Sequence, residues 1–301
     1  AALTQQTRLP WAGLLALAAG GFITILTEAL PAGLLPQIGA GLGVSEAWAG
    51  QLVSVYALGS LLTAIPLTAA TRAWPRRRLL LCAIAGFILA NTITALSPHY
   101  GLTLFARFLA GISAGLLWAL VAGYAARMVA PEQAGRAIAV AMVGTPLALS
   151  LGIPAGAVMG QMIGWRWTFG LMSVLSVLLL LVARRVLPEF PGQRGDASRR
   201  VGGVLRIPGV GIVLATLFAF VLAHNLLYTY IAPFAQHVGL AGQVDRLLLT
   251  FGLASLVGIG LVGLRVDRWL RGLTIAAVVL FLLATLALAA ASQHPSIVYL
   301  A

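Results

Sequence analysis

Long apolar segments recur along almost the whole chain, and this recurrence limits the possible folds more than any other feature. Each segment is about 20 residues long, the length that an α-helix needs to cross a ~30 Å hydrocarbon core. A tenth segment begins at Ile297 and is cut off at residue 301. Because backbone groups in lipid must be paired within the segment itself, the sequence predicts an all-α membrane protein. The nine complete segments lie roughly at residues 12–32, 48–69, 79–97, 103–126, 138–160, 168–187, 209–231, 247–264 and 273–291.

The arginines are sorted between the two sides of the membrane. If the N-terminus is cytoplasmic, 16 of the 19 basic residues fall on cytoplasmic loops or helix ends, and the exceptions are Arg107, Arg166 and Arg246. This positive-inside sorting predicts a multi-pass membrane protein with its N-terminus in the cytoplasm.

The composition excludes several classes of function. The chain is 60% hydrophobic and 9% charged, and its net charge of +12 is spread over short loops beside apolar segments. We therefore expect contact with anionic lipid headgroups and no binding of nucleic acid. No phosphate-binding loop and no nucleophile with a base is present, and His99, His224, His237 and His294 lack metal-ligand spacing. We expect neither an enzyme nor a cofactor nor a metal site.

A polar stretch and a repeat predict two halves. The interpretation is an N-terminal six-helix bundle at 1–187, a cytoplasmic linker at 188–208, and an incomplete C-terminal bundle at 209–301. Short basic loops with a tryptophan recur six segments apart, at 71–78 and at 263–272. Parallel halves related by an axis along the membrane normal produce such a repeat, although two short cytoplasmic loops would both be arginine-rich in any case.

At this point the chain resembles the major facilitator superfamily, whose members have two six-helix halves joined by a cytoplasmic loop. The resemblance implies twelve helices, so the chain would stop at the start of the tenth. The second basic loop matches the family's Gly-x-x-x-Asp-Arg-x-x-Arg signature. In the first loop Thr71 stands where an aspartate is expected. The gating and packing residues implied by the two loops are Arg72, Arg76, Gly263, Asp267, Arg268 and Arg271.

Glu28 is the only acidic residue well inside an apolar segment. A charge at mid-membrane depth is costly and is usually directed to a cavity or a partner. Thr24 lies one helical turn earlier and makes this face polar. We expect Glu28 to bind and release a proton during transport, and the alternative is a static carboxyl that is hydrogen-bonded to a neighbouring helix.

Arg107 is the only basic residue well inside a segment. Gly111 and Gly115 follow at four and eight residues, so a second helix is expected to approach closely along the same face. The pattern is similar to the superfamily's fourth-helix Arg-x-x-x-Gly motif, which implies proton coupling. The alternative is an interfacial arginine whose side chain extends to the headgroups. Whether Glu28 and Arg107 interact stays open.

Glycines repeat every four residues in the fifth segment. Gly152, Gly156 and Gly160 form one smooth face, and Pro154 permits a bend. This resembles the antiporter signature of proton-coupled drug exporters, in which the glycines would let the two halves slide and seal. Ordinary tight helix packing explains the glycines equally well.

The remaining cavity candidates are polar or aromatic residues on helices that line the central cavity in the superfamily. His224, Asn225 and Tyr228 are neighbours on the seventh segment. By the resemblance, the substrate-facing set consists of Thr24, Tyr56, Trp118, His224, Asn225 and Tyr228 around Glu28 and Arg107. Hydrogen bonding between helices is the alternative for each member.

The resulting hypothesis is a monomeric, proton-coupled exporter of a small organic solute such as a sugar, nucleoside or drug. The runs 27–36 and 48–53 resemble the sugar-efflux and arabinose-efflux branch of the drug:proton antiporters. The alternative is a proton:solute symporter or facilitator that imports a small metabolite. Substrate identity and the direction of transport stay open.

Overall fold

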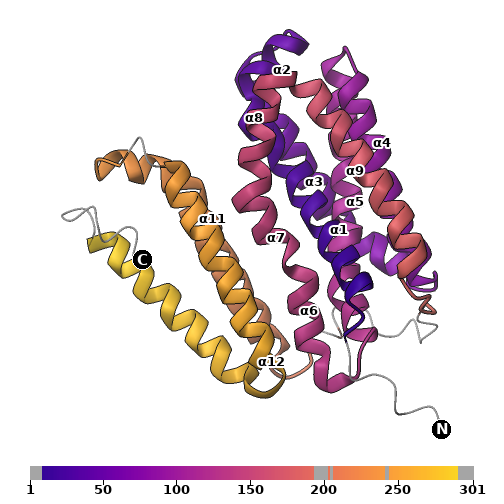
Figure 1. Cartoon of the computed structure of the whole chain (residues 1–301), viewed down its shortest axis with the longest axis vertical. Helices are drawn as coiled ribbons and strands as arrows, with labels where there is room; N and C mark the ends of the chain where they lie inside the picture. The colour runs from indigo at the N-terminus through magenta and orange to yellow at the C-terminus, as the bar shows by residue number, and fades with distance from the viewer. Residues whose placement is uncertain (1–8, 193–202, 204–205, 241–243, 291–301) are drawn as a thin grey trace. The chain divides into compact units, whose positions relative to one another are not determined.

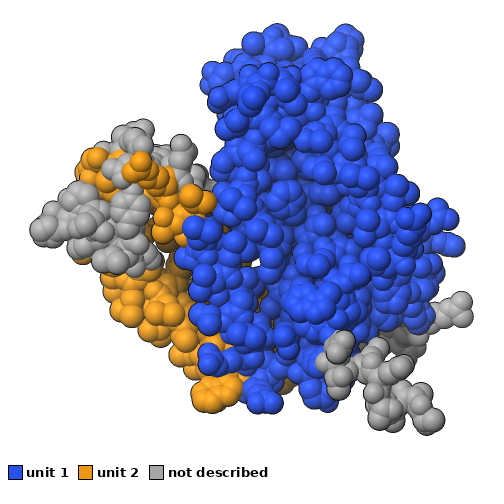
Figure 2. Space-filling model, viewed as in Figure 1, with its two compact units in different colours: residues 1–193, 251–268 blue, residues 194–250, 269–301 orange. Residues whose placement is uncertain are grey.

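The computed structural model describes residues 9–192, 203, 206–240 and 244–290, and the regular elements in these ranges are all helices (Figure 1). The chain divides into two compact units, which are coloured separately in Figure 2. Unit 1 contains residues 1–193 and 251–268, and unit 2 contains residues 194–250 and 269–301. Most of the expected linker and the expected tenth segment lie outside the described residues.

Among the described residues, eight helical stretches are long and apolar enough to cross a membrane. Seven of them coincide with the first seven expected segments, and the last covers the expected eighth and ninth together. In α12 (Val244–Ala290) only Trp269 departs from helical geometry, with φ −126° and ψ 29°. α12 thus consists of two helices that meet at a kink, and this kink lies within the loop expected at 263–272. The stretches are Trp11–Leu42, Glu46–Ala70, Arg76–Leu96, Tyr100–Arg127, Pro131–Ile163, Trp165–Val186, Val210–Leu227 and Leu249–Ala290.

Unit 1 begins with six membrane-spanning stretches. Gly43, with φ +67°, ends α2 in a left-handed conformation, and the Ser45 hydroxyl caps α3 by accepting a bond from the Trp48 N–H (3.4 Å). Its elements are α1 (Trp11–Ala29), η1 (Leu30–Leu34), α2 (Leu35–Leu42), α3 (Glu46–Ala70), α4 (Arg76–Leu96), α5 (Tyr100–Arg127), η2 (Pro131–Gln133), α6 (Ala134–Met142), α7 (Gly144–Leu147), η3 (Ala148–Gly152), α8 (Ile153–Ile163) and α9 (Trp165–Val186).

The core of unit 1 lies between its helices, and α3 against α5, α4 against α5 and α4 against α9 form the largest interfaces. The outward face of α9 is apolar as well, since Val174, Leu178 and Leu181 are exposed. A water-soluble protein rarely exposes so continuous an apolar surface. The exposed face is therefore expected to contact lipid.

The glycines that follow Arg107 bring two helices together, as their spacing predicts. The partner is α3: a Cβ placed on Gly111 would lie 2.0 Å from the carbonyl oxygen of Tyr56, and one on Gly115 would lie 2.8 Å from that of Ser60. Only glycine permits this backbone approach. The prediction of a close helix contact at this face is confirmed.

We expect Gly111→Ala to destabilise unit 1 by roughly 1–3 kcal/mol, because the added methyl group meets a backbone oxygen that cannot rotate away. Denaturant unfolding of the purified protein measures the effect. Gly170→Ala is the matched control on α9, where a Cβ meets nothing within 4 Å. This control should be neutral or stabilising by up to ~1 kcal/mol. Equal stability of the two variants would contradict the interpretation of the contact.

The glycine face of the fifth stretch packs on α1 and on η1, which follows it. Cβ atoms placed on Gly152, Gly156 and Gly160 would meet, in order, Phe22, Leu30 and Leu34. The bend expected near Pro154 is present as a π-helical turn, η3, that ends at Gly152. The face is thus a tightly packed interface within unit 1, and a role in sliding and sealing the two halves stays a prediction.

Unit 2 contains α11 (Val210–His237) and two parts of α12, residues 244–250 and residues 269–290. Its described core is small, with Ala235, Val238, Leu240 and Leu247 buried. Most apolar side chains on α11, such as Ile212, Leu217 and Phe218, are exposed.

Candidate functional site

The first helix is interrupted in the middle of the first membrane-spanning stretch. α1 ends at Ala29, and Pro31 follows in η1. Proline has no N–H, so the carbonyl of Thr27, four residues earlier, lacks its helical donor. Thr27 is fully buried, and an unpaired buried carbonyl is costly. The sequence therefore creates an acceptor that a neighbouring helix must satisfy.

Arg107 supplies the missing donor. Its Nη2 donates to the carbonyl of Thr27 (2.6 Å) and more weakly to that of Glu28 (3.4 Å), and its Nε points to the carbonyl of Leu52 at 3.5 Å. The side chain is 0% exposed. This burial overturns the alternative of an interfacial arginine, because the guanidinium lies inside the bundle and is bound to α1 and α3.

Two aromatic rings enclose the guanidinium. The Arg107 Cζ lies 4.9 Å from the ring centre of Tyr56 and 5.7 Å from that of Phe169, distances at which a cation is attracted to a ring face. The Tyr56 hydroxyl donates to the carbonyl of Thr24 (3.0 Å). Tyr56 is thus a wall of the arginine site, and its hydroxyl is already engaged.

Asn91 on α4 extends this network, although sequence reasoning did not select it. Its amide Nδ2 donates to the Thr27 hydroxyl (3.2 Å), and the residue is fully buried. Within the described part of the chain, Asn91 Oδ1 and Arg107 Nη1 have no hydrogen-bond partner. A buried amide in an apolar helix was the available signal for Asn91. No comparable signal marked Phe169.

Glu28 lies at the edge of this network and is half-buried. The charge of its carboxyl acts on both Arg107 and Tyr56. The only ion pair among the described residues joins Arg77 and Glu189, so Glu28 and Arg107 do not form one within 4.0 Å. The Arg107 bonds go to backbone carbonyls of α1 and α3, and the carboxyl of Glu28 has no salt bridge among the described residues.

Thr24 and Trp118 flank the same region, and Thr24 takes part in its hydrogen bonds only through its backbone carbonyl, which accepts from the Tyr56 hydroxyl. The Thr24 hydroxyl donates to the carbonyl of Gly20 in its own helix (2.8 Å). Trp118 is half-buried, and its ring lies close to α1: a Cβ placed on Gly21 would be 3.6 Å from it. The structure therefore brings Glu28, Arg107, Tyr56 and Thr24 together, with Trp118 one turn away along α1.

The seventh-segment candidates lie on α11 in unit 2. His224 is half-buried, and the exposed Asn225 uses its amide to donate to the carbonyl of Val221 (2.8 Å). The side chain of Tyr228 lies outside the described residues. The amide of Asn225 thus bonds its own helix rather than a neighbouring one, and its place in a substrate cavity stays a prediction.

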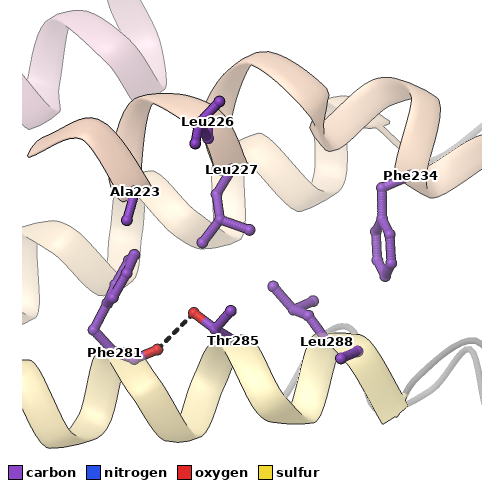
Figure 3. Close-up of a pocket in the computed structure, with 8 residues that line it drawn as sticks. Ala223, Leu226, Leu227, Phe234, Phe281, Thr285 and Leu288 are labelled. Carbon is purple, nitrogen blue, oxygen red and sulfur yellow. Dashed lines mark hydrogen bonds between the residues drawn. The ribbon is translucent and has the colours of Figure 1, made fainter. Parts of the chain in front are cut away.

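Unit 2 also contains an apolar pocket of about 430 Å³ between α11 and α12 (Figure 3). Leu227 and Phe281 point into it from opposite helices, and its one hydroxyl, Thr285, donates to the carbonyl of Phe281 (2.8 Å). Without a free polar group, such a pocket can select a ligand only by shape. It contains none of the residues that sequence reasoning selected.

The second basic loop makes a charged contact at one end of unit 1. The Asp267 carboxylate accepts bonds from the backbone N–H groups of Gly135 (2.6 Å) and Arg136 (3.1 Å), at the N-terminus of α6. A carboxylate at a helix N-terminus is stabilised by the helix dipole. Gly263 lets the two helices approach, because a Cβ placed on Gly263 would lie only 3.0 Å from the Cβ of Ala139. Arg268 and Arg271 are exposed.

The first basic loop bonds to α3 and to the chain that follows α9. The Thr71 hydroxyl donates to the carbonyl of Leu67 in its own helix (2.7 Å). Arg76 donates through Nη2 to the carbonyl of Arg72 (3.3 Å), and through its N–H to the carbonyl of Phe190 (2.8 Å). This loop is tied to the chain that follows α9.

We expect Asp267→Asn to loosen the contact between α12 and α6, because the amide keeps an acceptor but loses the charge. If the contact loses ~1 kcal/mol of stability, the fraction of molecules in which α12 and α6 are separated rises about fivefold. The measurement is the maleimide labelling rate of a cysteine placed at Ala139 in a Cys82→Ser background. Asp267→Glu, which keeps the charge, is the control. An unchanged labelling rate in Asp267→Asn would show that the carboxylate does not hold this contact closed.

These features define a polytopic α-helical membrane protein with a charged cluster inside its first bundle. The sequence pattern of the Major Facilitator Superfamily matches residues 17–301, and the chain belongs to this superfamily of secondary transporters. It is 36% identical over 283 residues to chloramphenicol efflux pumps of Mycobacterium tuberculosis strains CDC 1551 and H37Rv. The alignment covers 90% of this chain and 68% of each pump.

Solved structures show the same fold. A double tryptophan mutant of XylE matches with a TM-score of 0.67 and 16% identity, over 85% of this chain and 69% of that chain. The human organic anion transporter MFSD10 matches with a TM-score of 0.65 and 18% identity, over 90% of this chain and 76% of that chain. The predicted family and fold class are confirmed, and the chain is a multi-pass membrane transporter rather than an enzyme.

Proposed function

We propose that this chain is a proton-coupled exporter of a small organic solute in a bacterial inner membrane, with its N-terminus in the cytoplasm. The 36% identity to proteins named chloramphenicol efflux pumps carries the proposal. Chloramphenicol is accordingly the first substrate to test, ahead of sugars and nucleosides. The transport unit is a monomer with halves at 1–187 and 209–301, joined by a linker at 188–208, and it works by alternating access.

The cluster in unit 1 offers a physical basis for proton coupling. Glu28 lies three residues before Pro31, beside the two carbonyls that Arg107 binds. When Glu28 loses its proton, a negative charge develops next to the guanidinium. That charge competes with the carbonyls of α1 for Arg107. Protonation returns Arg107 to the carbonyls, so the proton on Glu28 selects between two arrangements of the interrupted helix.

In unit 1, substrate binding would be linked to this switch through the Trp118 ring that lies against α1, and the resemblance adds polar residues of the seventh helix to the substrate-facing set. Trp118 supplies an aromatic surface, and His224, Asn225 and Tyr228 supply polar groups on the seventh helix. Asp267 at the N-terminus of α6, with Gly263, Arg268 and Arg271 nearby in sequence, would hold one side of the transporter closed. The close packing of Gly152 and Gly156 on α1 would transmit movement of the interrupted helix to α8.

The test measures proton movement in proteoliposomes that hold the full-length protein and a trapped pH-sensitive dye. An inside-acid gradient is imposed, and chloramphenicol is then added outside. Antiport exchanges entering substrate for protons, so the lumen becomes more alkaline. Symport carries protons inward with the substrate and acidifies the lumen. Substrate entry without any pH change would exclude proton coupling, and a panel of sugars and nucleosides identifies the substrate class if chloramphenicol is not carried.

A further inference from the structure

A small polar cavity lies at one end of unit 1, the end that the arginine sorting predicts to be cytoplasmic. Its volume is about 230 Å³, below the range of about 300–1,000 Å³ typical of drug-sized ligands. It is separate from the cluster around Arg107. Its lining includes Thr68, Arg76, Tyr124, Arg127 and Phe190.

One wall of the cavity is the chain that follows α9, and several bonds hold it in place. The carbonyl of Phe190 accepts from the Arg76 N–H (2.8 Å), and Glu189 forms an ion pair with Arg77 (3.1 Å). The ring of Phe190 packs edge-on against that of Tyr124, with centres 5.1 Å apart. The Tyr124 hydroxyl donates to the carbonyl of Pro188. The cavity is therefore a built feature, with its aromatic residues fixed as walls.

Two arginines line the cavity, and neither of them forms an ion pair with a described carboxylate. Arg76 and Arg127 both line it, whereas the one ion pair of the described residues is Arg77 with Glu189. The positive charges of Arg127 and Arg72 both act on Arg76. Like charges at such range are unfavourable, and a bound anion would relieve their repulsion.

Thr68 contributes a hydroxyl that the helix does not use. Thr63 and Thr71 on the same helix donate to carbonyls four residues earlier, at 2.6 and 2.7 Å. The Thr68 oxygen is buried and has no partner among the described residues. A buried hydroxyl without a partner is uncommon and indicates an absent ligand or water.

We propose that this cavity binds a phosphate group, with Arg76 and Arg127 as the cationic ligands and Thr68 as a hydroxyl donor. Guanidinium groups bind phosphate oxygens through paired, charge-assisted hydrogen bonds, and the volume suits one such group. The phosphate belongs either to an anionic phospholipid of the inner leaflet or to a soluble phosphate. Occupancy would tie Phe190, and with it the start of the linker, to the ends of α4 and α5.

The experiment compares lipid and phosphate binding by the full-length protein and its variants. Native mass spectrometry counts phosphatidylglycerol retained from nanodiscs with equal phosphatidylglycerol and phosphatidylcholine. Thermal unfolding against inorganic phosphate at constant ionic strength tests the soluble source. The variants are Arg76→Gln with Arg127→Gln, and Thr68→Val. The matched control is Arg184→Gln with Arg185→Gln, which removes two exposed charges at the end of α9 that do not line the cavity.

Wild type should bind one of the two ligands specifically. The Arg76 and Arg127 variant should bind it at least about tenfold more weakly, and Thr68→Val roughly threefold more weakly. The control pair should stay within about twofold of wild type. Selective retention of phosphatidylglycerol identifies a lipid headgroup, and stabilisation by inorganic phosphate alone identifies a soluble ligand.

If the control double variant loses as much binding affinity as the Arg76 and Arg127 double variant, the proposal is overturned. Binding would then be a diffuse attraction between anions and the basic surface. The proposal is likewise overturned if neither ligand distinguishes wild type from the cavity variants. Thr68→Val removes no charge and leaves the arginines in place, so it tests the site even if the double variant does not fold.

Discussion

Glu28→Gln should abolish substrate-dependent proton movement while leaving the protein folded. Glutamine has nearly the same shape as a protonated glutamate but cannot release a proton. The variant is therefore held in the arrangement in which Arg107 binds the carbonyls of Thr27 and Glu28. In proteoliposomes with an inside-acid gradient, the pH change on addition of substrate should fall to the level of protein-free vesicles. Substrate exchange without a gradient should continue, because it needs no net proton transfer.

The control for this variant is another carboxylate on the same chain. Glu189→Gln removes a carboxylate that pairs with Arg77 outside the cluster, and transport should stay within about threefold of wild type, since exposed ion pairs contribute ~1 kcal/mol or less. Proton movement that survives in Glu28→Gln would assign the coupling proton to another group and leave Glu28 with a static structural role.

The sequence predicts depth in the membrane well and partners between helices poorly. Segment lengths and arginine sorting place Glu28 and Arg107 inside the membrane, because hydrophobic thickness acts on each helix separately. The spacing of Gly111 and Gly115 correctly predicts a close helix contact on the face of Arg107. It does not say which helix approaches, since small residues permit contact with any partner. The structure shows that the partner is α3.

The acceptors of Arg107 were readable in principle. Pro31 lies four residues after Thr27, so the sequence already implies a carbonyl without a donor. Sequence reasoning considered the carboxyl of Glu28 as a partner and overlooked the backbone. The roles of Asn91 and Phe169 were not readable, because a single amide or ring in an apolar helix does not show which neighbour it contacts. The same limit applies to Asn225, whose amide bonds its own helix.

Arg107→Met should abolish coupled transport and also destabilise the protein. The methionine fills similar space but leaves the buried carbonyl of Thr27 without a donor, at an expected cost of roughly 1–3 kcal/mol. Part of this cost is offset because a buried charge is also removed. Denaturant unfolding measures the stability, and the dye assay in proteoliposomes measures the coupling, which should fall to the level of protein-free vesicles.

A second substitution separates the two roles of Arg107. Pro31→Ala restores an N–H four residues after Thr27, so the helix itself can satisfy the carbonyl. In the Arg107→Met background this change should recover most of the lost stability, because the interrupted helix no longer needs an outside donor. It should not restore proton movement, since the cation that Glu28 acts on is absent. Recovery of both properties would show that Arg107 serves only to satisfy the backbone. Recovery of stability alone, with coupling still lost, would establish that the arginine also responds to the charge on Glu28.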